Sequence, residues 1–220
     1  MLIDFSSCVE IINSIHKSPI SKVFHIGAHE GQEAAAYQSQ GVEKVIWFEA
    51  NTDLITKLKQ HLINFSIDSL IIPRALWNDN TRLNFNITNN EQSSSFFELK
   101  NHSNYYPDVV VTEKKYINAY RLDSIINLEP NLLDWHDFDF INIDTQGAEL
   151  AILQGIGNYL NQDSLKGIYV EVNSEELYKG IPMVDEIDSY LRQFNFHRCL
   201  SHWTNVGWGD ALYVKSLNLY

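Results

Sequence analysis

Two glycines and a carboxylate early in the chain have the spacing of a small-molecule site. In "FHIGAHEG" (24–31), Gly27 ends an apolar run and Gly31 precedes helix-forming residues; Glu49 ends the next apolar run. Glycine lets a ligand lie against the main chain, and a helix N-terminus offers unpaired N–H groups. A carboxylate at the second strand end can accept hydrogen bonds from both hydroxyls of a ribose. The spacing predicts a nucleoside site, with a plain tight turn as the alternative.

The glycine pattern also bears on which nucleoside binds. His29 and Gln32 stand where the dinucleotide fingerprint G-x-G-x-x-G has its second and third glycines. Without these glycines the chain approaches a pyrophosphate less closely, which disfavours a nicotinamide cofactor. S-adenosylmethionine carries a short amino-acid tail instead of a pyrophosphate. The loop therefore favours S-adenosylmethionine as the cofactor.

Two carboxylates end later apolar runs, Asp144 in "INIDTQG" and Glu171 in "YVEVN". Asp144 is our first candidate for a general base, which a hydroxyl acceptor needs within hydrogen-bond reach; capping the next helix is the alternative. Glu171 is a second candidate, as a base or as a partner of acceptor hydroxyls. If the two lie side by side in a buried site, the pKa of Glu171 is raised.

Histidine supplies the remaining candidates for proton transfer, since imidazole titrates near neutrality. His29 is a candidate base because it lies inside the glycine loop, and His102 and His202 are the other histidines expected near the site. A structural role is the alternative for each. Asp144, Glu171 and His202 could also hold a divalent ion, but the pattern is not specific and we do not favour a metal.

A polar, serine- and asparagine-rich segment covers residues 89–108. Long irregular segments inside a compact domain are usually functional loops. We expect this one to act as a lid or substrate loop that excludes water, with Ser94 near the donor; a solvated loop is the alternative. Trp77 is expected against adenine. Trp203 and Trp208 flank the last turn and are either sugar-stacking or core residues.

The elements that would position these residues alternate along the chain. Periodicity predicts strands at 22–27, 44–50, 69–77, 82–88 and 167–173, and helices at 32–39, 52–62, 148–160 and 184–194. The chain closes with two strands and no helix between them. The order predicts an α/β fold with a doubly wound, mostly parallel sheet and an antiparallel C-terminal hairpin. Ligands bind such sheets beyond the carboxyl ends of the strands.

Length, charge and cysteine content narrow the class of protein. The 220 residues suit one domain (1–220), with an amphipathic helical extension at 1–20. A net charge of −12 argues against nucleic acid as a partner. We expect no membrane span, because no apolar run reaches about 20 residues. The two cysteines indicate no disulfide framework, so we expect a cytoplasmic protein.

The ordered set of motifs resembles the FkbM-type methyltransferases, a branch of the class I S-adenosylmethionine-dependent enzymes. The matching segments occur in the family order: "FHIGAHEG" (24–31), "FEA" (48–50), "SSS" (93–95), "LD" (122–123), "INIDTQGAE" (141–149) and "VEV" (170–172). The chain departs from the family pattern at four positions: His25 for an acidic residue, His29 for Asn, Ala50 for Pro and Asn142 for Lys.

The resemblance implies a Rossmann-like fold with a seven-stranded sheet and O-methylation of a hydroxyl on a sugar, glycan or related natural product. A donor-binding protein of the same fold without catalysis is the alternative. A carboxylate at position 25 would normally help hold the amino-acid end of S-adenosylmethionine, so His25 changes that contact. The residues expected to hold the donor are His25, Gly27, Ala28, Gly31, Glu49, Ala50, Trp77, Ser94, Asp144 and Gln146.

Overall fold

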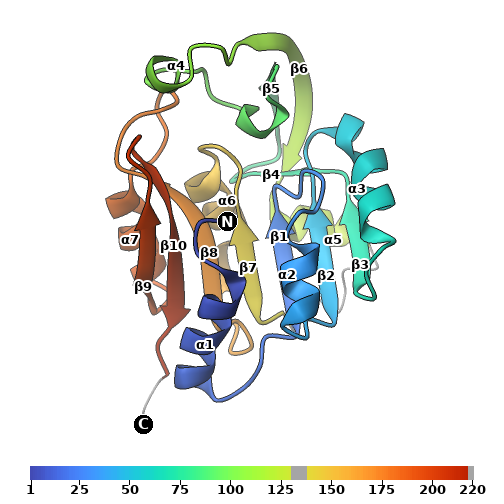
Figure 1. Ribbon diagram of the computed structural model, residues 1–220, viewed down its shortest axis with the longest axis vertical. Coiled ribbons are helices and arrows are strands. Elements are labelled where there is room, and N and C mark those ends of the chain that lie inside the picture. The colour runs from blue at the N-terminus through green and yellow to red at the C-terminus, as the bar shows by residue number, and fades with distance from the viewer. Residues whose placement is uncertain (130–137, 218–220) are drawn as a thin grey trace.

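The computed structural model describes residues 1–129 and 138–217 and is built on one large sheet (Figure 1). Its seven strands lie in the order β3-β2-β1-β7-β8-β10-β9, and β10 runs opposite to the other six. The strands are β1 (Lys22–Ile26), β2 (Lys44–Phe48), β3 (Asp68–Ile72), β7 (Phe140–Ile143), β8 (Gly167–Asn173), β9 (Phe196–Trp203) and β10 (Trp208–Lys215). This confirms the predicted mostly parallel sheet with an antiparallel C-terminal hairpin.

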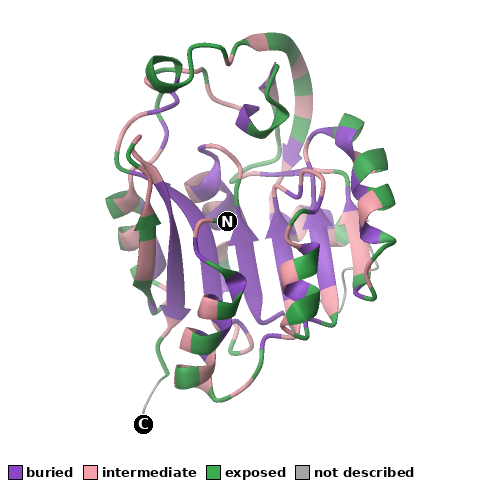
Figure 2. Cartoon of the chain, in the orientation of Figure 1, coloured by how far each residue is buried: buried purple, intermediate pink, exposed green. Residues whose placement is uncertain are grey.

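The central strands form where the sequence has continuous apolar runs. In β7 and β8 every residue is buried, and in β1 and β2 all but the first, as expected for strands covered on both faces (Figure 2). The predicted strand at 69–77 is instead two strands. Pro73 follows β3, and Ala75–Leu76 (β4) pairs with a different sheet. Proline lacks the N–H that a continuing ladder needs, so the chain changes sheet there.

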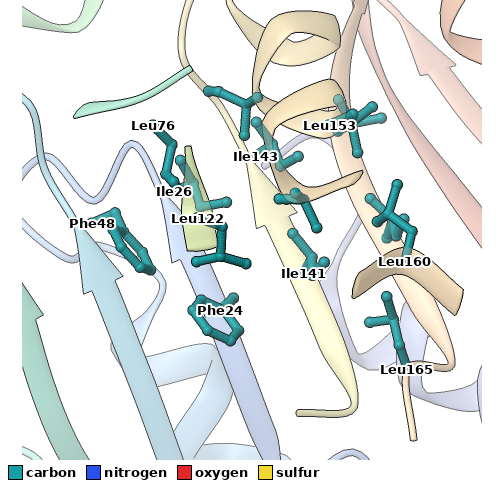
Figure 3. Packing of buried hydrophobic residues seen from close by; sticks show 14 of the residues in the cluster. Phe24, Ile26, Phe48, Leu76, Leu122, Ile141, Ile143, Leu153, Leu160 and Leu165 are labelled. Atoms are coloured by element: carbon teal, nitrogen blue, oxygen red, sulfur yellow. The ribbon is translucent and has the colours of Figure 1, made fainter. Parts of the chain in front are cut away.

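Helices cover both faces of the sheet and enclose two apolar cores. On one face lie α1 (Phe5–His16), α2 (Ala34–Ser39) and α3 (Ile55–Leu62), the last preceded by η1 (Thr52–Leu54). On the other lie α5 (Leu122–Leu128), α6 (Glu149–Ile156), which runs into η5 (Gly157–Asn161), and α7 (Val184–Arg192). Figure 3 shows Phe24 of β1, Ile141 of β7 and Leu153 of α6 as parts of this second core.

The expected amphipathic N-terminal helix is α1, which buries Phe5, Val9 and Ile12 against the sheet. Its apolar residues recur at helical spacing, so one stripe faces the core. In the described ranges, no helix is long and apolar enough to cross a membrane.

A second, three-stranded sheet rises beyond the carboxyl ends of the large one (Figure 1). It consists of β4 (Ala75–Leu76), β6 (Val111–Tyr120) and β5 (Thr81–Thr88), with β5 and β6 as a long antiparallel pair. The segment 89–108 between them is not irregular throughout, because it contains η2 (Glu91–Ser93) and α4 (His102–Tyr105). The second sheet thus carries this segment over the strand ends.

Candidate functional site

A cavity of about 490 Å³ lies at the carboxyl ends of β1, β2, β7 and β8. Its volume is within the range of about 300–1,000 Å³ that is usual for small-molecule sites. The strand ends form its floor, and residues 90–96 with parts of 102–106 line it from the side of the second sheet. This is the position at which ligands bind open parallel sheets.

The cavity collects most of the residues singled out by the sequence. The predicted site residues that line it are His25, Gly27, His29, Glu49, Ala50, Ser94, Asp144, Gln146 and Glu171. Ala28, Gly31 and Trp77 are not part of the lining. Ala28 is fully buried in the core under α1, Gly31 packs against Leu58 of α3, and the Trp77 ring packs against those of Phe96 and Phe97.

The glycine turn brings β1 and β7 into close contact. Gly27 has a φ of +90°, and a β-carbon there would lie 1.9 Å from the carbonyl oxygen of Asp144. The N–H groups of Gly27 and Ala28 both donate to the carbonyl of Phe48 at 3.0 Å. The turn therefore ties the ends of β1, β2 and β7 together, and the need for glycine at 27 comes from this packing.

Glu49 is buried at the end of β2 and braces two loops. One carboxylate oxygen accepts the N–H of His29 at 2.7 Å, and the other accepts the N–H of Asn51 at 2.6 Å. Burial raises the pKa of Glu49, and these two backbone donors oppose the rise. Each oxygen accepts one of these N–H groups and has room for a second hydrogen bond, so the carboxylate can still accept ligand hydroxyls.

Gln146 links the two candidate bases. Its side-chain amide donates to Asp144 Oδ1 at 3.1 Å and to Glu171 Oε2 at 2.7 Å. Its amide oxygen lies 2.9 Å from the hydroxyl of Tyr178, and its backbone carbonyl accepts the Ser95 hydroxyl at 2.6 Å. With φ at +56°, Gln146 holds the turn in a left-handed conformation. One residue therefore aligns both carboxylates and joins them to the segment above.

The two candidate bases have different surroundings. Asp144 is exposed within the cavity mouth, whereas Glu171 is 5% exposed. Burial raises the pKa of Glu171 well above its usual value, and the neighbouring charges of Asp144, Glu149 and Asp210 add to the rise. The predicted effect of Asp144 on Glu171 is thus present, with burial as the larger cause. Glu171 is therefore suited to hold a proton at a pH where an ordinary carboxyl has lost it.

Glu149 stabilises the turn that follows β7. Its Oε1 accepts the N–H and the hydroxyl of Thr145 and the N–H of Gly147, each at 3.0 Å. Its Oε2 is shielded from solvent and has no partner in the described part of the chain. Burial raises the pKa of Glu149 to about 7. The side chain faces the main chain, so it supports the site from behind.

We expect Glu149→Gln to remove a pH-dependent loss of stability. The unfolded chain releases this proton near pH 4.5, but the folded protein holds it up to about pH 7. The carboxyl therefore favours folding below pH 4.5, and that contribution is lost as the pH rises to 7. Between these values the wild type should lose about 2 to 4 kcal/mol of unfolding free energy relative to the variant. Denaturant titrations at pH 4.5, 6 and 7.5 measure the difference.

The control for this prediction is Glu10→Gln, which changes an exposed glutamate on α1. Its stability should follow that of the wild type across the same pH range. A constant difference between wild type and Glu149→Gln at all three pH values would contradict the assignment.

His25 is part of a buried polar group. Its Nδ1 lies 2.8 Å from the Tyr37 hydroxyl, which also accepts the Asn142 side-chain amide at 2.8 Å. Burial lowers the pKa of His25, while Glu33, 3.8 Å from its Nε2, opposes the change. The departures from the family pattern at 25 and 142 are thus partners of one another. This chain has two hydrogen-bonded neighbours, His25 and Asn142, where the family pattern has an acidic residue and a lysine.

The possible metal set of the sequence does not come together. His202 is exposed on β9, with its Nδ1 3.1 Å from the carbonyl of Leu2, and is not in the lining with Asp144 and Glu171. In the described ranges another group, His29, Glu30 and Glu91, has its ligand atoms close together. The ammonium of Lys57 lies 3.2 Å from both of those carboxylates and already offsets part of their charge.

Several lining residues were not assigned to the site from the sequence. Asp210 of β10 accepts hydrogen bonds from the Leu2 N–H and the Tyr169 hydroxyl. The one feature of the sequence that marks Asp210 is that it is an acidic residue inside an otherwise apolar run. Leu177 and the residues at 1–2 reach the cavity from segments outside helices and strands, for which the sequence has no periodic signal. His102 was named as a histidine near the site without a role.

Two comparisons with solved structures support the fold. The chain is similar to the ribosomal protein L11 methylase from Lactobacillus delbrueckii subsp. bulgaricus, with 14% identity, a TM-score of 0.51 and coverage of 97% of this chain and 79% of that one. It is also similar to magnesium protoporphyrin IX methyltransferase (ChlM) from Synechocystis PCC 6803 with bound SAM, with 10% identity, a TM-score of 0.52 and coverage of 96% and 77%. No curated protein sequence matches the chain.

A family model gives the stronger result. The model for the methyltransferase FkbM domain matches residues 25–198, which include the glycine turn, Glu49, Asp144 and Glu171. The sheet order with its antiparallel β10 is the class I methyltransferase fold. By sequence and by fold, this chain belongs to the FkbM methyltransferase domain family.

Proposed function

We propose that the protein is an S-adenosylmethionine-dependent O-methyltransferase that acts on a hydroxyl of a sugar, glycan or related natural product. The observation that carries the proposal is the composition of one cavity. Buried Glu49 lies at its β2 end, and the linked carboxylates Asp144 and Glu171 lie at the ends of β7 and β8. A nucleoside site and a proton acceptor thus share one space.

The residues present fit the donor. Glu49 has acceptor capacity left for ribose hydroxyls, and the main chain at Gly27 and Ala50 lines the cavity beside it. Carboxylates also outnumber side-chain cations in the lining, which suits a donor with sulfonium and ammonium charges. When bound, S-adenosylmethionine supplies an electrophilic methyl group. His25 stays neutral and offers a polar contact in place of a carboxylate.

In this proposal Asp144 accepts the proton of the acceptor hydroxyl. Gln146 holds Asp144 at 3.1 Å and fixes the direction of its carboxylate. Glu171 binds the acceptor, because its raised pKa lets it retain a proton and donate a hydrogen bond. Fixing the acceptor oxygen in line for attack supplies several kcal/mol of the barrier reduction. His29 is assigned a structural role, since its Nδ1 faces the Gln32 side chain at 2.8 Å.

Glu49→Ala is expected to weaken binding of S-adenosylhomocysteine by about 1–3 kcal/mol, or about 5- to 150-fold in Kd. The change removes the ribose partner and frees the N–H groups of His29 and Asn51. Isothermal titration calorimetry measures the affinity. Glu43→Ala, an exposed change near the other end of β2, is the control and should bind like the wild type. Equal affinity of Glu49→Ala and wild type would remove the ribose assignment.

A turnover assay separates an enzyme from a donor-binding protein. The wild type is incubated with methyl-labelled donor and a mixture of methyl glycosides, and labelled product is counted. Binding of S-adenosylhomocysteine without transfer to any acceptor would favour the non-catalytic alternative. Absence of S-adenosylhomocysteine binding, with NAD as the comparison ligand, would reject the proposal.

We also propose a cytoplasmic location, because Cys8 and Cys199 are both free thiols.

A further inference from the structure

The cavity has a second half that the donor does not account for. Away from the glycine turn it is lined by His102, Tyr106, Leu177 and Trp208. Two segments form this wall: residues 98–106, which include α4, and the loop that follows β8. The backbone N–H groups of Lys100 and His102 donate to the carbonyl of Leu177 at 2.8 and 3.1 Å. The two segments are therefore fixed to one another, and Figure 1 shows α4 above the end of β8.

His102 is the unusual residue of this wall. It is only 5% exposed, and its ring packs against the rings of Tyr106 and Tyr178 at centroid distances of 4.9 and 5.3 Å. Its Nδ1 is shielded from solvent and has no hydrogen-bond partner in the residues that the structure describes. A buried polar atom without a hydrogen-bond partner destabilises the folded protein. Such an atom in the wall of a cavity indicates a ligand that supplies the missing hydrogen bond.

The chemistry of the wall limits what that ligand can be. Burial lowers the pKa of His102, so the imidazole is neutral and one ring nitrogen is a hydrogen-bond acceptor. The Asp210 carboxyl lines the same space and adds a further oxygen acceptor. Among the described lining residues Arg74 is the one Lys or Arg side chain, and it is bound to Glu129 at 2.8 Å. The half-cavity therefore favours ligands that donate hydrogen bonds and offers a phosphate no free Lys or Arg side chain.

We propose that the acceptor substrate is an uncharged polyhydroxylated ring, neither phosphorylated nor linked to a nucleotide, and that one of its hydroxyls donates to Nδ1 of His102. Tyr106 and Trp208, whose hydroxyl and indole N–H are 3.5 Å apart, provide the aromatic surface beside that contact. A phosphate group there would lie beside the Asp210 carboxyl and would find no free Lys or Arg side chain among the described lining residues to pair with its charge. This inference rests on the proposed methyl transfer and narrows its acceptor.

The test is an NMR titration of protein labelled with ¹⁵N-histidine and saturated with S-adenosylhomocysteine. The probes are the methyl glycosides of glucose, galactose and mannose and the 1-phosphates of the same three sugars. The Nδ1 signal of His102 is assigned by its absence in His102→Phe, which keeps a ring against Tyr106 and Tyr178. We expect at least one methyl glycoside to shift this signal and none of the sugar phosphates to do so.

The variants separate binding at His102 from a structural effect. His102→Phe should weaken the responding glycoside at least 10-fold and leave the affinity for S-adenosylhomocysteine unchanged. His102→Gln, which restores an acceptor atom, should recover part of the loss, and His197→Phe, an exposed change on β9, should have no effect. A silent His102 signal, an equal response to phosphates, or unchanged glycoside affinity in His102→Phe would overturn the inference. Failure to bind S-adenosylhomocysteine would instead reject the proposed function.

Discussion

Asp144→Asn is expected to lower the turnover number by about 10²- to 10⁴-fold, the usual contribution of a general base. The variant keeps Oδ1 as an acceptor for the Gln146 amide, so the turn after β7 should be preserved. What it loses is the ability to take the proton of the acceptor hydroxyl. Turnover is measured as release of S-adenosylhomocysteine in the presence of mixed methyl glycosides. Calorimetry should show an affinity for S-adenosylhomocysteine within about twofold of that of the wild type.

Asp68→Asn is the matched control, because it makes the same change at an exposed position where β3 begins. It should turn over like the wild type. Full turnover by Asp144→Asn would exclude Asp144 as the base. Glu171→Gln is assayed in parallel. A loss of turnover in Glu171→Gln alone would assign the role of general base to Glu171.

Gly27→Ala is expected to destabilise the protein by about 2–5 kcal/mol. A left-handed conformation costs a residue with a β-carbon about 1–2 kcal/mol, and overpacking adds about 1–3 kcal/mol. The new methyl group would lie 1.9 Å from the Asp144 carbonyl oxygen, so β1 and β7 must separate where the cavity lies. In a chain of this length the midpoint of thermal unfolding should fall by at least about 4 °C.

Gly41→Ala separates the two causes. Gly41 has a φ of +79°, but a β-carbon there meets nothing within 4 Å. It should therefore show the backbone cost alone, about 1–2 kcal/mol. Equal losses for the two variants in thermal unfolding would show that close packing at Gly27 contributes little.

The sheet could be predicted from the sequence because its strands are buried on both faces. Runs such as "GIYVEVN" have no other good environment, and the predicted range 167–173 is that of β8. The helical ranges were correct in place but too long at their ends; the helix predicted at 148–160, for example, changes to a 3-10 turn at Gly157. Hydrophobic periodicity shows which face is buried and carries less information about where hydrogen bonding changes type.

The second sheet and the far half of the cavity could not be predicted in the same way. The predicted strand at 69–77 is interrupted at Pro73, and its second part, β4, pairs with β6, more than 30 residues later in the chain. Trp77 follows β4 and therefore packs on Phe96 rather than lining the cavity. His102 reaches the wall through contacts of two loops. Strand-end residues such as Glu49 and Asp144 could be placed because the sheet itself fixes them.

The hydrogen bonds of Gln146 couple the position of residues 93–95 to the alignment of Asp144 and Glu171. Its backbone carbonyl is held by Ser95, and the Tyr178 hydroxyl lies between its amide oxygen and the carbonyl of Ser93. Any movement that lifts residues 93–95 off the strand ends must break the Ser95 bond and loosen the alignment of Asp144 and Glu171. A substrate that enters by this route would leave Asp144 misaligned until residues 93–95 return to the strand ends. Water that enters while residues 93–95 are displaced would find no aligned base, so it would not hydrolyse the methyl donor.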